Sequence, residues 1–473
     1  MPLHVEQFRS SKTPWEVFRA VYATSKTCFF LDSPQYAPPD QIYSYIGMDP
    51  VLEVRLEGTS LRVAGESRET YPAAESFAAL KKIFRRYRSS SGKEYPFFTG
   101  GFVGYFGYEL AELCDKIGFR PKKELGIPRL HLGLFREVIV YDHHRRVYYL
   151  VAYDAQRASR RNVFKNAKTC RERCEKLKKF FETLPVKSQP FHLKEIVPEM
   201  PKRRFKAMVE KAKDYIAAGD IYQANLSQRF RFGFSGSPAA LYGKLRAINP
   251  SPFSCFFRVG DLEIISSSPE RLIRKTGRIC ETRPIAGTCP SGGERNRPAV
   301  WRQKLLRNPK ERAEHLMLVD LERNDLGRVC DYRSVKVREF MTLEKYSHVV
   351  HIVSKITGRL KKGKDAFDLV RAIFPGGTIT GCPKIRCMEI IDALEPVRRG
   401  IYTGSLGYID LCGDMDLNIV IRTMILRKDR GHLQVGAGIV HDSDPEKEYE
   451  ETLHKAKALM KALKAASEEQ HYE

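Results

Sequence analysis

Long hydrophobic runs are missing from this sequence. No apolar stretch approaches the roughly 20 residues that a helix needs to cross a bilayer. The first residues, MPLHVEQFRSSKTPWEVF, lack the apolar centre of a secretory signal peptide. We therefore expect a soluble cytoplasmic protein with no membrane partner.

The cysteine spacing of a zinc site is also missing. The 11 cysteines are an odd number, and no CxxC pair is present. The closest pairs are Cys170 with Cys174 and Cys382 with Cys387. Structural zinc sites usually need tighter pairs, so we predict no zinc site and reduced thiols.

Familiar catalytic and nucleotide-binding patterns are absent as well. There is no Ser-His-Asp order and no Cys-His pair for covalent hydrolysis. Residues 97–109, FFTGGFVGYFGYE, carry four glycines without the strand–GxGxxG–helix order of a dinucleotide loop, so close β-packing is the better interpretation. Residues 374–384, FPGGTITGCPK, lack the phosphate-loop spacing, although backbone N–H groups at a helix start suit an anion.

Acidic residues are fewer than basic ones, and the formal net charge is +24. The excess is concentrated in residues 81–88, 157–187 and 201–213. A basic protein can bind nucleic acid, an acidic partner or an anionic substrate. Because no zinc finger or aromatic-rich RNA-binding pattern accompanies these segments, we expect no nucleic-acid partner and interpret 157–187 as a solvated helix, polar all round. A basic nucleic-acid-binding protein is the remote alternative.

The chain divides into three segments by pattern. Residues 1–154 predict a β-rich domain, 155–200 a basic helical connector with a proline-bearing linker, and 201–466 a larger domain of helices and strands. This mixture indicates an α+β fold with layered sheets. Strands are predicted at 27–31, 43–46, 51–56, 61–63, 137–142, 146–154, 220–232, 253–258, 262–266, 272–275, 334–340, 348–358, 404–409, 418–426 and 433–440. Helices are predicted at 203–218, 237–249, 298–320, 365–373, 384–394 and 447–466.

Two predicted helices carry acidic side chains at matching spacing. Glu448, Glu451 and Lys455 project from one face of the last helix, which Ser443 or Asp444 can cap. The helix over 310–320 offers a second pair, Glu311 and Glu314. Four carboxylates that meet would suit a hard cation such as Mg²⁺, whereas ordinary solvated helix faces are the plain alternative.

One arginine is a candidate anion ligand. If residues 416–426 form a continuous strand, then Asp416, Asn418, Val420 and Arg422 share one face. The planar guanidinium of Arg422 would then reach inward and suit a carboxylate. A surface arginine is the plain alternative.

Nine segments of the second half carry a joint resemblance to a known family. They are DIYQANLSQRF (220–230), SSSPERL (266–272), RPIAGT (283–288), KERAEHLMLVDLERNDLGRV (310–329), YSHVVHIVS (346–354), FPGGTITGCPKIRCMEIIDALEP (374–396), RRGIYTGSLGYID (398–410), MDLNIVIRT (415–423) and GAGIVHDSDPEKEYEETLHKAKAL (436–459). In this order they resemble the chorismate-utilising enzymes, the family of the anthranilate synthase and aminodeoxychorismate synthase large components. Residues 1–154 resemble the family more loosely, through FLDS (30–33), YSYIG (43–47) and FFTGGFVGYFGYEL (97–110).

The resemblance implies a large two-sheet β-sandwich flanked by helices, with residues 201–466 as a chorismate-binding catalytic domain. It also implies a site for one Mg²⁺ and chorismate. The implied metal ligands are Glu314 and Glu451, with Glu311 and Glu448 holding the metal's waters. The implied substrate ligands are Arg422, Tyr402 and the backbone of Gly436, Ala437 and Gly438, with Lys455 beside the metal-bound carboxylate, and His351 and Thr378 near the C4 hydroxyl.

The resemblance also bears on the nucleophile and the product. Gln223 stands where isochorismate and salicylate synthases carry a water-activating lysine, which implies ammonia as nucleophile and a separate glutamine amidotransferase subunit as its source. The motifs favour 4-amino-4-deoxychorismate, for 4-aminobenzoate and folate synthesis, as the product. Ala286 stands where many aminodeoxychorismate synthases have a lysine, so anthranilate with pyruvate is the alternative. The segment FLDS places Ser33 near a family tryptophan pocket.

Overall fold

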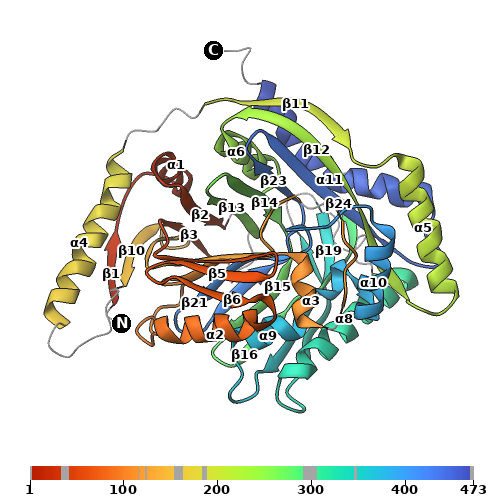
Figure 1. The fold of residues 1–473 in the computed structure, drawn as a ribbon, viewed down its shortest axis with the longest axis horizontal. Coiled ribbons are helices and arrows are strands. Elements are labelled where there is room, and N and C mark those ends of the chain that lie inside the picture. The colour runs from red at the N-terminus through yellow and green to blue at the C-terminus, as the bar shows by residue number, and fades with distance from the viewer. Residues whose placement is uncertain are drawn as a thin grey trace.

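The computed structural model describes residues 3–33, 42–115, 117–122, 125–153, 163–183, 189–290, 306–345 and 349–468. Within them the chain forms two twelve-stranded sheets with helices around them (Figure 1). The strand pairings described between neighbouring strands are antiparallel. The predicted α+β sandwich flanked by helices is therefore confirmed.

Sheet A has the order β1-β10-β9-β3-β2-β13-β14-β23-β24-β12-β11, with β20 beside β12. Its strands are β1 (Leu3–Phe8), β2 (Thr27–Asp32), β3 (Tyr43–Met48), β9 (Glu137–Asp142), β10 (Val147–Tyr153), β11 (Phe191–Pro198), β12 (Gln223–Gly236), β13 (Phe253–Val259), β14 (Leu262–Ser268), β20 (Gly381–Cys382), β23 (Thr423–Arg427) and β24 (Arg430–Ile439).

Sheet B has the order β17-β19-β16-β15-β22-β21-β7-β8-β4-β5-β6, with β18 beside β19. Its strands are β4 (Leu52–Glu57), β5 (Ser60–Gly65), β6 (Glu69–Pro72), β7 (Gly101–Phe106), β8 (Leu130–Phe135), β15 (Arg271–Thr276), β16 (Ile279–Thr282), β17 (Ile285–Pro290), β18 (Lys336–Lys345), β19 (Val349–Arg359), β21 (Ser405–Asp410) and β22 (Met415–Asn418).

The α-helices are α1 (Pro14–Thr24), α2 (Ser76–Tyr87), α3 (Ala111–Cys114), α4 (Val163–Glu182), α5 (Lys202–Ala217), α6 (Pro238–Ile248), α8 (Pro309–Val329), α9 (Ala366–Ile373), α10 (Lys384–Leu394) and α11 (Pro445–Glu468). Three 3₁₀ turns are η1 (Ala73–Glu75), η2 (Tyr108–Leu110) and η3 (Gly377–Ile379). None of the helices in the described ranges is long and apolar enough to cross a membrane.

Apolar side chains fill the space between the two sheets. Phe29 and Phe257 of sheet A are fully buried with Val103 and Leu406 of sheet B in one cluster. Two further clusters lie on the outer faces, where α1, α4, α6 and α11 cover sheet A and α2, α8 and α9 cover sheet B. Burying a phenylalanine contributes about 1.5–3 kcal/mol, so these layers dominate the stability of the sandwich.

Strands from both ends of the chain share both sheets. In sheet A, Phe30 of β2 pairs with Phe256 of β13. In sheet B, Tyr105 of β7 pairs with Leu406 of β21. Residues 1–154 and 201–466 therefore build one sandwich together. Their division into separate domains stays a prediction.

The basic helix α4 has an apolar face. Cys170, Cys174, Leu177 and Phe181 are buried at helical spacing in the cluster that covers sheet A. The prediction of a helix polar all round is therefore wrong for this face. The apolar stripe was not recognised in the sequence because it is narrow and half of it is cysteine, which behaves as a small apolar residue when buried. Residues 157–162 and 184–187 of the predicted segment lie outside the described residues.

Part of the predicted linker is a strand. β11 pairs with β12, Phe191 opposite Gly236, and forms the edge of sheet A. Its proline, Pro198, is the last residue of the strand, where a missing N–H is tolerated. The linker prediction is therefore wrong for residues 191–198.

The predicted strand over 418–426 is broken. β22 belongs to sheet B and β23 to sheet A, so residues 419–422 carry the chain from one sheet to the other. Arg422 has φ of 50°, the left-handed conformation that this sharp crossing requires. The idea that Asp416 and Arg422 share one strand face is therefore wrong, although both remain beside the interior of the sandwich.

The other predicted elements occur within a few residues of their expected places. The largest difference is in α8, which continues to Val329, nine residues past the predicted end. Its predicted first residues, 298–305, lie outside the described ones. Gly104 of β7 confirms the close-packing interpretation of the glycine-rich segment, because a Cβ there would lie 2.0 Å from the carbonyl oxygen of His131.

Candidate functional site

The glycines of β24 leave room for side chains from neighbouring strands and loops. A Cβ at Gly436 would lie 2.6 Å from Asn225 Oδ1 and 3.0 Å from the Tyr402 hydroxyl. A Cβ at Gly438 would lie 2.5 Å from the Gln223 amide nitrogen. These glycines therefore pack closely against Asn225, Tyr402 and Gln223, and their backbone lines the candidate site.

Ala437, between these glycines, points the other way. Its side chain is fully buried in a cluster with Phe205 and Ile439. Successive side chains of a strand point to opposite faces of its sheet. Ala437 can therefore contribute only its backbone to the site, as predicted for all three residues.

The helix α11 follows β24 after a short turn over residues 440–444. Asp444 caps it, since Asp444 Oδ1 accepts the N–H of Glu446 at 3.0 Å and of Lys447 at 2.9 Å. Pro445 occupies the first helical position. Ten residues after Pro445, Lys455 Nζ lies 2.7 Å from Glu451 Oε1 and donates to the Gly436 carbonyl oxygen at 3.0 Å. The predicted Glu–Lys face therefore reaches the edge of the glycine strand.

The helix α8 presents its two acids to other parts of the same region. The Gln223 amide donates to Glu314 Oε1 at 2.9 Å. Glu314 Oε1 also lies 3.8 Å from a Cβ built at Gly438. One turn earlier, Glu311 Oε2 lies 2.8 Å from a Cβ built at Gly287, a glycine with φ of 65°. Glu311 and Glu314 thus connect the RPIAGT segment with the start of β12.

The predicted metal ligands supply suitable atoms. Carboxylate oxygens from two helices are the donors that Mg²⁺ prefers, and Mg²⁺ keeps several waters beside one or two carboxylates. Glu448, in contrast, accepts a hydrogen bond from Ser443 Oγ at 2.7 Å. The described residues contain no set of three acidic, histidine or cysteine side chains placed close enough to bind an ion directly. Within the described residues, the four predicted carboxylates therefore do not gather into one direct metal-binding cluster.

His351 and Arg422 lie together on the sheet B side. His351 Nδ1 is 3.3 Å from the carbonyl oxygen of Gly287, and its neighbour Ile352 pairs with Ala286. Burial and, to a smaller extent, the nearby positive charge of Arg422 lower the pKa of His351 to about 4. The imidazole is therefore neutral at neutral pH. An Nδ1–H donor to Gly287 makes Nε2 the acceptor atom of the ring.

Glu270 is a functional candidate that sequence reasoning missed. It lies in SSSPERL between β14 and β15 and is 6 % exposed. Burial raises its pKa to about 8, while the facing Thr378 hydroxyl, the Ile285 amide and Arg422 act in the opposite direction. A protonated carboxyl group beside Thr378 and Arg422 can donate a proton. The only sequence signal was an acidic residue between a buried strand and the next.

A buried ion pair supports the floor of the site. Glu395 Oε1 lies 2.7 Å from Arg399 Nη2, and Arg399 also donates to the carbonyl oxygens of Ile379 at 2.9 Å and Asn225 at 2.6 Å. The guanidinium lies 5.8 Å from the Tyr402 ring centre. Arg399 thus fixes three segments around the site, and removal of one partner would leave a buried charge uncompensated.

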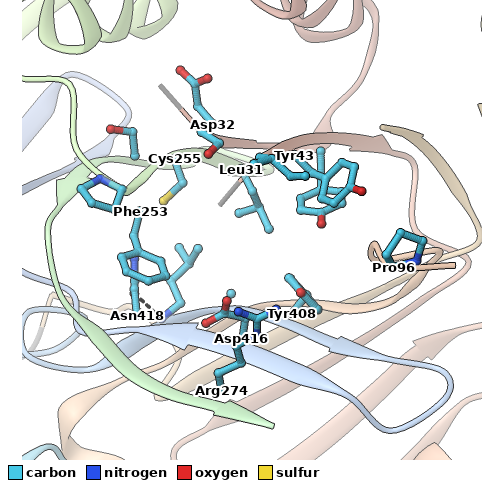
Figure 2. A pocket seen from close by; sticks show the side chains of 17 residues that line it. Leu31, Asp32, Tyr43, Pro96, Phe253, Cys255, Arg274, Tyr408, Asp416 and Asn418 are labelled. Atoms are coloured by element: carbon cyan, nitrogen blue, oxygen red, sulfur yellow. Dashed lines mark hydrogen bonds between the residues drawn. The ribbon is translucent and has the colours of Figure 1, made fainter. Parts of the chain in front are cut away.

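A separate pocket of about 100 Å³ lies between the sheets. Figure 2 shows Asp32, Tyr43 and Cys255 on one side of it and Arg274 and Asp416 on the other. Ser33, the residue predicted near a family tryptophan pocket, is among its lining residues. The backbone N–H of Ser33 donates to Ser44 Oγ at 3.0 Å.

The structure brings most predicted residues into one region. Gln223 meets Glu314, Lys455 meets Glu451 and Gly436, Tyr402 lies beside Gly436, and Arg422 lies near His351. Thr378 faces Glu270, and Ala286 precedes Gly287 on β17. Glu448 is held by Ser443 instead of a second carboxylate, and Ser33 lies in the other pocket.

Comparisons with known proteins identify the family of the chain. The sequence pattern of the chorismate binding enzymes matches residues 26–461. The chain is 39 % identical to aminodeoxychorismate synthase component 1 of Bacillus subtilis, over 90 % of each chain. It is also 39 % identical to anthranilate synthase component 1 of Aquifex aeolicus, over 99 % of this chain and 96 % of that one.

Solved structures give the same result. Anthranilate synthase component I from Streptococcus pneumoniae superposes with a TM-score of 0.76 at 35 % identity, covering 90 % of this chain and 94 % of that chain. The menaquinone-specific isochorismate synthase of Escherichia coli shares the fold, with a TM-score of 0.71 at 17 % identity over 98 % and 95 %. The matched pattern and these relatives place the chain in the family of chorismate binding enzymes.

Proposed function

We propose that this protein aminates chorismate at C4, giving 4-amino-4-deoxychorismate. The observation that carries the choice of ammonia as nucleophile is the contact of Gln223 with Glu314 at 2.9 Å. A glutamine amide is not a base, so this position cannot activate water as a lysine would. Ammonia, which needs no activation by a base, is then the nucleophile.

Two groups of residues would hold the substrate. Arg422 and Tyr402 take the enolpyruvyl carboxylate, together with backbone N–H groups of the Gly436–Gly438 segment. Glu314 and Glu451 would hold Mg²⁺, with Glu311 and Glu448 on its waters. When bound, the cation supplies positive charge for the ring carboxylate. Lys455, which contacts both Glu451 and Gly436, adds a second positive charge there.

The departing hydroxyl needs a proton. Glu270 holds one at neutral pH, because its pKa is raised to about 8 by burial. Thr378 faces Glu270 and would orient the hydroxyl, and neutral His351 would accept its hydrogen bond. In the net reaction the C4–O bond breaks, water leaves, and a C–N bond forms from ammonia. The proton that Glu270 gives up is replaced by one released from the attacking ammonia.

Ammonia implies a supplier, and we propose a separate glutamine amidotransferase subunit. Two relatives are named as component 1 of their synthases, which supports a second component. The product would serve 4-aminobenzoate and folate synthesis. The pocket beside Ser33 would hold tryptophan, either as a structural ligand or as an inhibitor.

Anthranilate synthesis is the second candidate, and Ala286 favours it. Ala286 lies on β17 opposite Ile352, next to the glycine that contacts His351. An alanine cannot add covalently to the substrate ring. We favour amination at C4 without a lysine adduct. Incubation of the pure chain with chorismate, Mg²⁺ and ammonium tests this choice. Formation of anthranilate with pyruvate would refute the proposal. A product that becomes 4-aminobenzoate only after a lyase is added would support it.

A further inference from the structure

The helix α8 carries a buried acid besides the two candidate metal ligands. Glu322 lies two turns after Glu314 and is 4 % exposed. A carboxyl group so deeply buried needs hydrogen-bond partners, because leaving it unpaired would lower the stability of the fold by roughly 1–3 kcal/mol. Its partners indicate what it does.

Glu322 bonds two segments that meet at the site. Its Oε2 accepts a hydrogen bond from Thr282 Oγ1 at 3.1 Å, and its Oε1 accepts the N–H of Gly377 at 3.3 Å. Thr282 ends β16 and leads into the RPIAGT segment. Gly377 begins η3, the turn that carries Thr378. One carboxyl group therefore joins α8, β16 and this turn.

The far end of the turn is anchored by other residues. Arg399 Nη1 donates to the Ile379 carbonyl oxygen at 2.9 Å, and the Asn225 N–H donates to the Thr380 carbonyl oxygen at 2.9 Å. The near end packs on α8, because a Cβ at Gly377 would lie 2.5 Å from a methyl carbon of Leu321. The Glu322 bond thus fixes the end of the turn that precedes Thr378.

We infer that Glu322 is a positioning residue that fixes the η3 turn, and with it Thr378, by joining this turn to α8 and β16. The reaction that this positioning serves is the proposed amination of chorismate, so that part of the inference rests on the proposed function. Glu322 itself does not touch the substrate. Its role is to keep Thr378, the residue proposed to orient the departing hydroxyl, in a fixed position.

The charges around Glu322 favour a neutral hydrogen-bonding group. Burial and the nearby carboxylate of Asp325 raise its pKa to about 7, against the opposing effect of the Lys384 ammonium. Glu322 in turn contributes to the raised pKa of Glu270. A glutamine could make both hydrogen bonds, accepting from Gly377 and donating to Thr282 Oγ1, without any charge.

Hydrogen exchange and kinetics on three variants test the inference. Glu322→Ala removes both bonds, so amide exchange in residues 374–380 should accelerate, and kcat for chorismate should fall at least about tenfold with KM changed less than about threefold. Glu322→Gln should retain most of the protection and most of kcat. Asp320→Ala is the matched control, because its side chain lies on the same helix, is 61 % exposed and pairs only with Arg323 in the contacts described.

Each outcome decides something specific. Unchanged exchange and kcat in Glu322→Ala would overturn the inference, and so would a glutamine variant as impaired as the alanine one. If Glu322→Ala does not fold, Thr282→Val, which removes one of the two bonds and keeps the shape, should lower kcat in the same direction. Wild-type protein that fails to turn over chorismate would refute the proposed function, while the exchange data would still decide whether Glu322 holds the turn.

Discussion

The side-chain amide of Gln223 donates a hydrogen bond of 2.9 Å to the carboxylate of Glu314. This contact joins the first residue of β12 to the helix that carries two candidate metal ligands. It also places a non-basic group at the position where the resemblance implies a water-activating lysine in isochorismate and salicylate synthases. Under the proposed function, the choice between ammonia and water as nucleophile depends on this pair.

Gln223→Lys should change the nucleophile. The lysine would form an ion pair with Glu314, and its neutral form could act as a base toward water. We expect ammonia-dependent amination to fall at least about tenfold and a hydroxylated isomer of chorismate to appear, as measured by chromatography of the products. Gln223→Met is the control, which should lose amination without gaining the isomer. Full amination by Gln223→Lys would contradict this role.

Glu451→Ala should abolish chorismate turnover and leave the fold intact. Its side chain is half exposed and paired with Lys455, so the lost ion pair lowers the free energy of unfolding by less than about 1 kcal/mol. Turnover at saturating Mg²⁺ and the thermal midpoint check the two halves of this prediction. Glu450→Ala, an exposed neighbour on α11, serves as control and should behave as wild type. Normal activity of Glu451→Ala would refute its assignment as a metal ligand.

The pH dependence of catalysis should report the Glu270 proton. Because the carboxyl group must be protonated to act as an acid and its pKa is about 8, kcat/KM should fall as the pH rises through about 8. Glu270→Gln should lose most of kcat at every pH, since an amide cannot give up a proton. A wild-type profile that stays flat up to about pH 10 would contradict the acid role.

Stability should depend on pH for the same reason. Glutamate ionises near pH 4.5 in the unfolded chain but only near about 8 when buried at position 270. Between these values the folded protein holds one proton more than the unfolded chain, so stability falls as the pH rises. Glu270→Gln should remove this pH-dependent loss of stability, because an amide does not ionise. Urea unfolding at about pH 5 and about pH 9 should therefore show the variant gaining stability relative to wild type at the higher pH. Equal differences at both values would contradict a raised pKa.

Arg422→Lys should weaken substrate binding. A lysine keeps the charge but not the planar pair of donors that matches a carboxylate. We expect KM for chorismate to rise about tenfold or more, which corresponds to about 1.4 kcal/mol. Arg427→Lys, an arginine at the far end of β23 that pairs with Asp261, is the control. A KM unchanged in Arg422→Lys would show that this arginine does not hold the substrate.

The sequence predicted the elements of the fold better than their junctions. The helical spacing of Glu448, Glu451 and Lys455 and the cap at Asp444 are local features, and both occur as expected. The crossing at Arg422 was missed because the alternating pattern of residues 416–426 continues through it, and only the separation of the two sheets shows the bend.

Glu270 was missed for a related reason. A glutamate after a strand is usually exposed, and its burial arises from segments more than a hundred residues away, including Thr378 and Arg422. The contact between Gln223 and Glu314 likewise joins residues 91 positions apart. Sequence patterns give the residue types and local spacing of such a site, whereas long-range packing determines which of them meet.

The most direct test of the central claim follows the nitrogen atom. The purified chain is incubated with chorismate, Mg²⁺ and isotopically labelled ammonium, and the product is examined by NMR and mass spectrometry. Amination at C4 predicts a product that carries the labelled nitrogen on C4 and retains the enolpyruvyl group. Labelled anthranilate together with an equal amount of pyruvate would contradict the account.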